Sequence, residues 1–409
     1  MRIAHPHREP SALGMIMTTT VDQPLQVGMV GYAFMGAAHS QAWRNAPSFF
    51  ELPLIPEMTA ICGRDRDAAM KVAGRFGWQS VETDWHALLH RPDIDLIDIC
   101  TPGDTHAEIA IASLEAGKHV LCEKPLANTV AEAEAMAAAA AKAAESGVRS
   151  MVGFTYRRVP AIGLAQRLIA QGRIGVIRNV RAQYLQDWIV DPKAPLFWRL
   201  RKEVAGSGAL GDIGAHIVDL VQYMSGEQIT GLSALTTTFI KERPLPSSTS
   251  GLSGTSGTEM GEVTVDDAAV FIAKLSGGGL ATFEATRFAT GRKNAIRIEI
   301  NGSEGSLAFD FEDMNLLHFF DNNDDPEVAG FRRILVTEPM HPYVKAWWPA
   351  GHLIGYEHGF THQVVDLIED IAAGRDPQPS FADGLRVQRI LDAVEKSAAN
   401  SSTWMEIPA

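Results

Sequence analysis

The chain has 409 residues, a formal net charge of −13 at pH 7 and a hydrophobic content of 46%. This length allows two domains with full cores, and the composition is ordinary for a globular protein. The negative charge argues against electrostatic binding to nucleic acid or to an anionic membrane, and we find no run of about 18 apolar residues that would span a bilayer.

Three cysteines, Cys62, Cys100 and Cys122, lie in apolar, strand-like runs. An odd number of cysteines in such runs suits reduced thiols better than a disulfide framework, so we expect a cytoplasmic protein. Residues 1–24 are polar and lack the apolar centre of a signal peptide. We expect them to form a disordered extension.

Short apolar runs alternate with helix-like segments from residue 25 to residue 150. Apolar runs of this length are typical of buried parallel strands, and several of the helical segments end at a glycine. The alternation predicts an α/β unit over 25–150, a Rossmann domain with a doubly wound parallel sheet. The expected strands are 25–30, 58–62, 96–100, 119–122 and 150–154, and the expected helices contain His39 and Trp43 or cover 68–76, 107–116 and 130–145.

The pattern changes after Tyr156 to alternating strands separated by glycine turns. This predicts a second α/β domain over 151–409 with a large, open, mainly antiparallel sheet covered by helices on one face. The Ser-, Thr- and Gly-rich residues 246–261 are expected to form a flexible loop, and a helix over 359–373 is expected to pack back on the chain. Because the bare sheet face needs a cover, we expect a homo-oligomer. The expected strands are 176–184, 232–240, 268–275, 279–286, 296–301 and 306–311.

A glycine turn at residues 31–36, Gly-Tyr-Ala-Phe-Met-Gly, follows the first expected strand and opens a helix. In this context backbone N–H groups at a helix N-terminus can hold a dinucleotide pyrophosphate. Ala33 takes the place of the middle glycine, and a tight strand–helix turn without any ligand has the same pattern. The residues expected to bind the cofactor here are Gly31, Ala33, Phe34, Met35 and Gly36.

The second strand ends in Gly63-Arg64-Asp65, where an acidic residue would bind the ribose 2′-hydroxyl of NAD. No acid lies at the strand end itself, and Arg64 there suits the 2′-phosphate of NADP. This gives a slight preference for NADP, with NAD as the alternative. Arg64 can also be a solvated loop cation, and Asp65 is displaced by only two positions.

Glu123-Lys124-Pro125 ends another strand at the sheet edge where ligands bind. The proline stiffens the turn, and Lys124 can hydrogen-bond both a substrate hydroxyl and the nicotinamide ribose. In a dry site, or beside a second cation, the pKa of this lysine falls toward the range useful for proton transfer. A plain surface lysine after a strand is the alternative.

Asp212 and His216 are four residues apart in a segment that opens a helix, so they share one face. His216 can accept a hydroxyl proton while hydride leaves the carbon, and Asp212 can orient the substrate or tune the imidazole. Two alternatives stay open: a helix cap with a core histidine, or a metal site completed by Asp219. The rest of a metal shell is not evident, and we expect no metal.

Together the Glu-Lys-Pro and Asp-x-x-x-His elements resemble those of the Gfo/Idh/MocA oxidoreductases, from about Leu25 to the C-terminus. Thr101-Pro102 with His106 is similar to the family's strand-end loop, although Gly103 stands where asparagine is usual. Thr155 also replaces a usual asparagine, which puts one hydrogen bond to cofactor or substrate in doubt.

The resemblance implies a catalytic group of Lys124, Asp212 and His216, with His216 as acid/base. It implies sugar or cyclitol substrates, NAD or NADP as cofactor, and a dimer or tetramer formed through the open sheet. The segments Trp198-Arg199, 206–211 and 184–188 resemble the branch of sugar and anhydrosugar oxidisers. Cofactor contacts are expected from Gly63, Arg64, Thr101, Pro102, His106, Glu123 and Lys124, and sugar contacts from Lys124, Tyr156, Arg158, Gln186, Asp187, Trp188, Asp212 and His216.

An aromatic face with polar groups suits a polyol, although Trp188 and Tyr156 can equally be core aromatics. Three functions fit these motifs: net oxidation of a sugar or cyclitol, transient oxidation that assists glycoside cleavage, and non-enzymatic sugar sensing. The first is the main prediction. Intact Lys124, Asp212 and His216 argue against a sensor, which needs no proton-transfer group.

Overall fold

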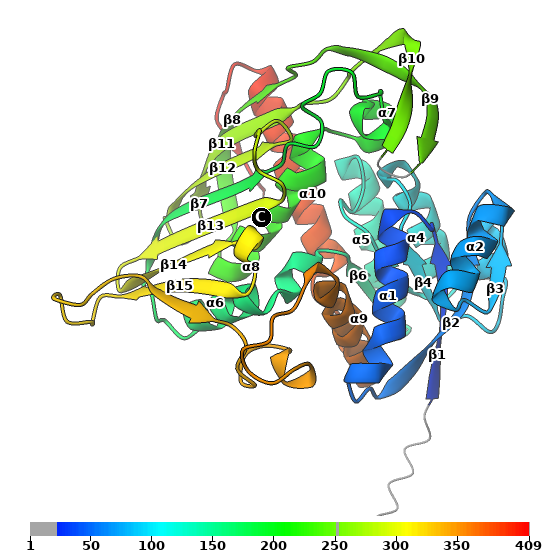
Figure 1. Ribbon diagram of the computed structural model, residues 1–409, viewed down its shortest axis with the longest axis horizontal. Helices are drawn as coiled ribbons and strands as arrows, with labels where there is room; N and C mark the ends of the chain where they lie inside the picture. The colour runs from blue at the N-terminus through cyan, green and yellow to red at the C-terminus, as the bar shows by residue number, and fades with distance from the viewer. Residues whose placement is uncertain (1–22, 251–252, 409) are drawn as a thin grey trace, which may run out of the picture.

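The computed structural model describes residues 23–250 and 253–408, which form two α/β domains built around two sheets (Figure 1). The first sheet has six parallel strands in the order β3-β2-β1-β4-β5-β6, the arrangement of a dinucleotide-binding fold. The predicted Rossmann domain is confirmed. Its elements are β1 Gln23–Val30, α1 Phe34–Phe49, β2 Leu54–Cys62, α2 Arg66–Phe76, β3 Ser80–Glu82, α3 Trp85–Leu89, β4 Leu96–Ile99, α4 His106–Glu115, β5 His119–Cys122, α5 Val130–Ala144 and β6 Ser150–Val152.

The second sheet has nine strands in the order β16-β15-β14-β13-β7-β12-β11-β8-β17. Only β7 and β12 run parallel, and the other neighbours are antiparallel, as predicted. The strands are β7 Ile177–Leu185, β8 Ile229–Thr237, β11 Ala268–Leu275, β12 Leu280–Thr286, β13 Ala295–Gly302, β14 Gly305–Asp310, β15 Leu316–Asp321, β16 Arg332–Leu335 and β17 Met405–Glu406. The helices of this half are α6 Pro160–Ala170, α7 Lys202–Ala205, α8 Ala215–Ser225, α9 Tyr356–Ala373 and α10 Phe381–Ala399.

Several boundaries differ from those expected. The expected loop at 246–261 instead contributes to a hairpin of β9 Glu242–Ser250 and β10 Ser253–Glu262, in which Arg243 and Gly261 are paired across the strands. Threonine and serine suit an exposed two-stranded ribbon, and turn residues alone did not reveal the pairing. The strand β6 extends the first sheet beyond residue 150, and β1 begins at Gln23, inside the expected extension. Residues 1–22 of that extension lie outside the described residues.

Two C-terminal helices return to the first domain and join the two halves. The helix α9 packs against α1, and α10 packs against α5 and β8 (Figure 1). The sequence predicted the first of these helices and missed α10, whose Ser380 and Asp383 form a capping box. Both helices therefore contact elements of the two domains that border the cleft.

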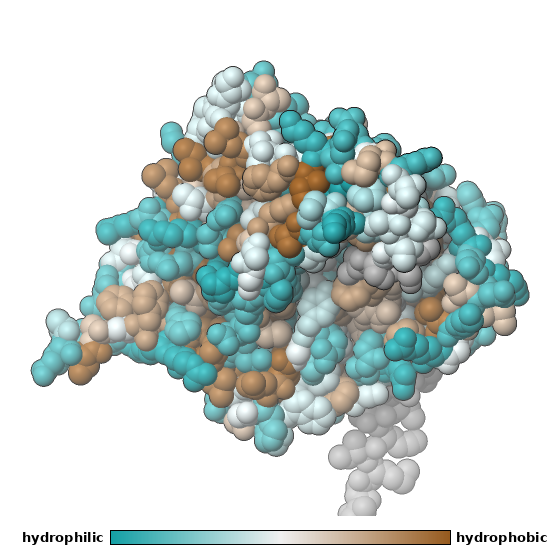
Figure 2. All heavy atoms as spheres, turned by 45° about the horizontal axis from the view of Figure 1, so that its top comes forward, coloured by the Kyte–Doolittle hydropathy of each residue, from teal (hydrophilic) through white to brown (hydrophobic). Residues whose placement is uncertain are grey.

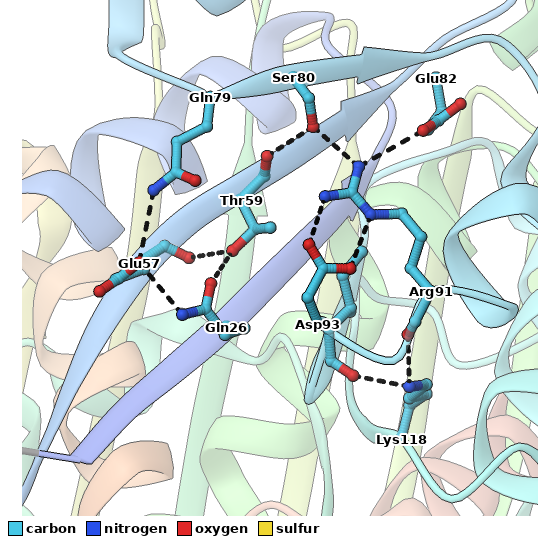
Figure 3. A network of polar contacts seen from close by, with 10 residues as sticks. Gln26, Glu57, Thr59, Gln79, Ser80, Glu82, Arg91, Asp93 and Lys118 are labelled. Atoms are coloured by element: carbon cyan, nitrogen blue, oxygen red, sulfur yellow. Dashed lines mark hydrogen bonds and ion pairs between the residues drawn. The ribbon is translucent and has the colours of Figure 1, made fainter.

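A polar network lies at the amino ends of the parallel strands (Figure 3). The Arg91 guanidinium donates to both carboxylate oxygens of Asp93 and, at 2.8 Å, to the Ser80 hydroxyl. The Lys118 ammonium donates to the backbone carbonyls of Arg91 and Ile94 at 2.9 and 2.7 Å. These contacts join β3, the turn before β4 and the start of β5, so this edge of the sheet is tied together by polar contacts.

One face of the nine-stranded sheet is covered by helices, whereas large apolar side chains stand on the other. Val270 and Leu235 face each other across β11 and β8, and each is at least half exposed, as are Ile272 and Leu280. Figure 2 shows hydrophobic side chains gathered between hydrophilic ones on the surface of this half. The helical segment over residues 202–225 is long and apolar enough to span a membrane by length and composition. However, 72% of its most apolar 18-residue window is buried inside the molecule.

Candidate active site

A cleft of about 550 Å³ lies between the two domains, beside the carboxyl ends of β1, β4 and β5. Ligands of open α/β sheets bind at this edge. The first domain contributes Ala33 to Met35, Thr101, Pro102, His106, Glu123 and Lys124, and the second contributes Tyr156, Gln186, Trp188, Asp212 and His216. The structure therefore brings most of the predicted site residues to one cleft.

The glycine turn before α1 has the geometry of an anion cradle. Gly31 has φ of +104°, and a Cβ on Gly36 would lie 2.3 Å from the Gly31 carbonyl oxygen, so larger residues do not fit. No side chain caps the start of α1 and no acidic residue lies in its first turn. Its free N–H groups fit a dinucleotide diphosphate.

The residues at the end of β2 that were expected to bind the cofactor, Gly63 and Arg64, lie outside the cleft lining. Gly63 leaves room for the Tyr32 ring, since a Cβ there would lie 1.9 Å from Tyr32 Cε1. The Asp65 carboxylate accepts two backbone N–H groups and caps α2. Arg64 is exposed and has no hydrogen bond or ion pair to any residue that the structure describes. Neither Gly63 nor Arg64 lines the cleft between the domains.

Lys124 and Asp212 meet across the domain boundary. The Lys124 ammonium donates to the Asp212 backbone carbonyl at 2.8 Å and lies 3.6 Å from its carboxylate. Asp212 belongs to a π-helical turn, Leu210–Gly214, that leads into α8, where His216 lies. Such turns occur frequently at functional sites, and this one replaces the simple first helical turn that the sequence indicated.

The charges around Asp212 determine which groups are ionised. Burial acts to raise the pKa of Asp212, but Lys124, Arg199 and Arg287 lower it to about 2. Burial, followed by the charge of Lys124, lowers the pKa of His216 well below its usual range. The site therefore holds a carboxylate next to an ammonium, together with a neutral imidazole that can accept a proton.

The imidazole of His216 is held by aromatic rings and has an unpartnered nitrogen. The Tyr156 ring packs edge-on against it, with centroids 4.7 Å apart. Its Nδ1 is buried without a hydrogen-bond partner among the described residues. A buried polar atom of this kind needs a partner, and an internal water molecule can supply it.

A chain of polar groups extends from Tyr156 along the second domain. The Tyr156 and Tyr184 hydroxyls lie 2.8 Å apart, and the Tyr184 hydroxyl donates to the Asn294 side chain at 2.7 Å. Gln186 donates to the same Asn294 oxygen at 2.8 Å and accepts from the Trp188 indole at 3.1 Å. These side chains line the cleft, so Tyr156 and Trp188 present a polar-edged aromatic surface to it.

Arg158 does not line the cleft, which corrects the prediction that it contacts the sugar. Its guanidinium is buried, pairs with Asp366 at 3.1 Å and also donates to the Gln378 backbone carbonyl. The sequence could not distinguish this structural ion pair from a ligand contact, because Asp366 lies more than 200 residues further along the chain.

Two other predicted residues have protein partners. Asp187 accepts from the Lys293 ammonium at 2.7 Å and from the Gly291 N–H, so it positions Lys293, which lines the cleft in its place. His106 makes hydrogen bonds to the backbone carbonyls of Thr101 and Pro125 and shapes the wall. Both carboxylate oxygens of Asp219 accept hydrogen bonds from the Arg157 guanidinium. This pairing argues against a metal site made of Asp212, His216 and Asp219.

Sequence reasoning missed several residues of the cleft: Tyr184, Asn294, Lys293, Asn128 and Tyr356 as site residues, and Arg287 beside Asp212. Asn128 fills the space next to Gly103, since a Cβ on Gly103 would lie 2.5 Å from its side-chain oxygen. Arg199 lies against the Trp198 ring, 4.2 Å from its centroid, and also lines the cleft. The Trp-Arg pair was visible in the sequence as a branch feature, but its place beside Asp212 was not.

A dinucleotide-type cradle, facing a lysine, a carboxylate and a neutral histidine from a second domain, defines a two-domain oxidoreductase of the nicotinamide-dependent class. Residues 25–154 match the model of the oxidoreductase family with an NAD-binding Rossmann fold, and residues 162–308 match the GFO/IDH/MocA C-terminal domain. The chain belongs to the Gfo/Idh/MocA oxidoreductase family, as the sequence motifs predicted.

Named relatives give the same placement. Levoglucosan dehydrogenase of Pseudarthrobacter phenanthrenivorans is 43% identical over 391 residues, which cover 94% of this chain and 99% of the relative. A crystal structure of an oxidoreductase domain protein from Kribbella flavida has a TM-score of 0.91 with 69% identity, and it covers 95% of this chain and 100% of that one. A levoglucosan dehydrogenase complex with NADH has a TM-score of 0.89 with 41% identity and covers 94% and 100% of the two chains.

Proposed function

We propose that this protein is a nicotinamide-dependent dehydrogenase that oxidises a hydroxyl-bearing carbon of a sugar, an anhydrosugar or a cyclitol. The observation that carries the proposal is the convergence of Lys124, Asp212 and His216 opposite the glycine turn. The relatives support the substrate class, because one solved structure is a levoglucosan dehydrogenase complex with NADH and levoglucosan.

His216 acts as the base in this proposal. Its imidazole is neutral and lines the cleft, so it accepts the proton of the substrate hydroxyl. Lys124 donates a hydrogen bond to the same oxygen and stabilises the negative charge that develops there. A nicotinamide cofactor held at the glycine turn before α1 would supply the acceptor for the hydride that leaves this carbon.

Asp212 and its cations hold the lysine in place. Because its carboxylate stays ionised, it orients the Lys124 ammonium from one side while its backbone carbonyl accepts from the same ammonium. Arg287 and Arg199 balance its charge. Arg199 has no hydrogen-bond acceptor among the described residues, so we expect it to donate to a substrate oxygen that is not oxidised.

The polyol lies against Tyr156 and Trp188, with Gln186, Asn294 and Lys293 available to its other hydroxyls. An aromatic surface bordered by donors and acceptors suits a sugar ring, which has an apolar face and polar edges.

The assay is the absorbance of reduced nicotinamide with NAD or NADP and a panel of pyranoses, anhydrosugars and inositols. Growth of absorbance with one class of substrate supports net oxidation. A flat trace with release of an aglycone from glycosides, and no net change in cofactor, would instead support redox-assisted cleavage. Binding of sugar without either reaction would support a sensor.

For the cofactor we propose NAD, with NADP also accepted through Arg64. The uncommitted guanidinium at the end of β2 can bind a 2′-phosphate, while the Asp65 carboxylate that would oppose it already caps α2. Arg64→Ala should raise KM for NADP about 10-fold and leave KM for NAD nearly unchanged.

Arg66→Ala is the matched control, because Arg66 is also exposed and begins α2 only two residues later. Loss of the Arg66 guanidinium should change KM for NAD and KM for NADP by the same factor. If Arg64→Ala weakens NAD and NADP alike, Arg64 does not contact the 2′-phosphate and the proposal that NADP is accepted through it is wrong.

We also propose that two copies associate through the bare face of the nine-stranded sheet. The exposed apolar side chains of β8, β11 and β12 form one patch, since Val270 faces Leu235 and Ile272 lies two residues further along β11. Sedimentation analysis should give a dimer or tetramer, and Ile272→Lys should lower the assembly. A monomeric wild-type protein at micromolar concentration would refute this.

A further inference from the structure

His39 is a buried histidine of α1 that the proposed reaction does not use. Its Nδ1 lies 2.9 and 3.0 Å from the two carboxylate oxygens of Asp98 on β4, and its Nε2 lies 3.0 Å from a carboxylate oxygen of Glu123, directly after β5. All three side chains are almost completely buried. The imidazole therefore joins the helix that follows the glycine turn to two strands of the parallel sheet.

Two carboxylates on one imidazole restrict its protonation state. An ionised carboxylate only accepts hydrogen bonds, so both ring nitrogens must donate, and only the imidazolium has two N–H groups. The other groups facing this cluster are the Trp43 indole, which donates to Asp98 at 2.7 Å, the Cys100 thiol and the Phe360 ring. Burial acts to lower the pKa of His39, but Asp98 raises it well above the usual range.

Glu123 connects this cluster to the active site. Its second oxygen accepts from the Lys124 backbone N–H at 3.2 Å, and its side chain lines the cleft. The first oxygen lies against Gly153, where a Cβ would come within 2.7 Å of it. Without an N–H donor on its inner side, the Glu123 carboxylate would be free to turn toward the Lys124 ammonium, which lines the same cleft.

We propose that His39 is a positioning residue, a permanently charged imidazolium that holds Glu123 away from the Lys124 ammonium and so leaves this ammonium for Asp212 and the substrate. The inference rests on the proposed function for its kinetic consequence. The protonation and the hydrogen bonds of His39 do not depend on which reaction the cleft catalyses.

The first test is therefore independent of activity. Nitrogen-15 labelling of histidine, with a His39→Gln spectrum subtracted to assign the signal, should show both ring nitrogens of His39 protonated at neutral pH and up to about pH 8.5, well above the unperturbed histidine pKa of about 6.5. A ring with a single N–H at neutral pH would mean that a carboxylate carries the proton, and it would overturn the proposal.

The second test uses two amides that each preserve one side of the imidazole. In His39→Gln the amide reaches the position of Nε2 and can still donate to Glu123, whereas in His39→Asn it reaches only the position of Nδ1 and donates to Asp98. We expect kcat of the Asn variant to fall about 10-fold or more and that of the Gln variant to stay within about 3-fold, because small displacements of reacting groups cost this much. KM for the sugar should change little in both.

Trp78→Phe is the control for a purely structural effect. The buried Trp78 indole donates at 3.0 Å to the hydroxyl of Ser40, which follows His39 on α1. This hydrogen bond does not involve Glu123, so its loss should lower stability without lowering kcat. Equal kcat in the Asn and Gln variants would overturn the positioning role. If no sugar is oxidised at all, the proposed function fails, but the nitrogen-15 result still decides the charge of His39.

Discussion

Polar side chains lie at both edges of the parallel sheet, and the contrast is between the paired Arg91 and Lys118 at the amino edge and the unpaired atoms around the cleft at the carboxyl edge. At the amino edge, Arg91 and Lys118 have acceptors at hydrogen-bond distance (Figure 3). At the carboxyl edge, atoms of His216, Thr155 and Asn128 are buried without partners among the described residues. Satisfied networks stabilise a fold, whereas unpaired polar atoms in a cleft are groups that a ligand can complete.

The largest effect is expected at the carboxyl edge. Lys124→Ala and His216→Ala should each lower kcat by about 10²-fold or more, because each removes a proton-transfer or charge-stabilising group. Urea unfolding should show the fold retained with some loss of stability, because Lys124→Ala removes the contacts to Asp212 and His216→Ala leaves space beside the Tyr156 and Phe154 rings. Either variant turning over like the wild type would show that its assigned role is wrong.

The dependence of kcat/KM on pH tests the protonation state of His216 at the carboxyl edge. Because the pKa of His216 is lowered in the folded protein, the imidazole stays neutral below the usual histidine range. We expect kcat/KM for oxidation to stay flat as the pH falls through about 6.5 and to decline only at lower pH. The stability linked to this group is present above about pH 6.5 and is lost as the pH falls through the lowered folded value.

Lys124→Met tests the cause of that shift. Burial is the larger cause and the Lys124 charge the next, so removing the charge should move the acid limb of the profile upward, toward the usual histidine value. An acid limb already centred near 6.5 in the wild type would show that His216 is not the titrating base, or that the cleft is wetter than the structure implies.

Features that depend on residues close together in the chain could be predicted from the sequence, whereas contacts between distant segments could not. The strand–helix alternation is a local pattern, and it predicted the fold. The Glu-Lys-Pro and Asp-x-x-x-His elements are also local, and the family resemblance they carry implied that Lys124, Asp212 and His216 act together. Arg158 and Asp366 form a pair between residues far apart in the chain, so the charge of Arg158 was interpreted as a sugar contact. Arg287 and Asn294 reach the site only because β12 and β13 flank β7, a pairing that no local pattern shows.

A smaller effect, of the opposite kind, is expected at the amino edge. Arg91→Ala removes the donor to Asp93 and Ser80, and we expect it to lower the free energy of unfolding by about 1 kcal/mol, a modest value because the guanidinium is partly exposed to solvent. Turnover should stay within about 2-fold, which is near the noise of such a measurement. A large loss of kcat with unchanged stability would mean that the two edges are coupled.

The smallest change is expected at Thr155, which lies at the carboxyl edge and is nearly buried. Its hydroxyl oxygen has no hydrogen-bond partner among the described residues, so Thr155→Val removes an unsatisfied polar atom and keeps the shape of the side chain. We expect the unliganded protein to be as stable as the wild type or more stable by up to about 1 kcal/mol, the reverse of what loss of a paired hydroxyl would cost. Thermal unfolding without NADH measures the stability of the unliganded variant, and unfolding with NADH measures how much the cofactor stabilises it. If the hydroxyl contacts the cofactor, the stabilisation by NADH should be smaller in the variant. A variant that is clearly less stable without ligand would show that the hydroxyl is already paired, and the contrast between the two edges would not extend to this residue.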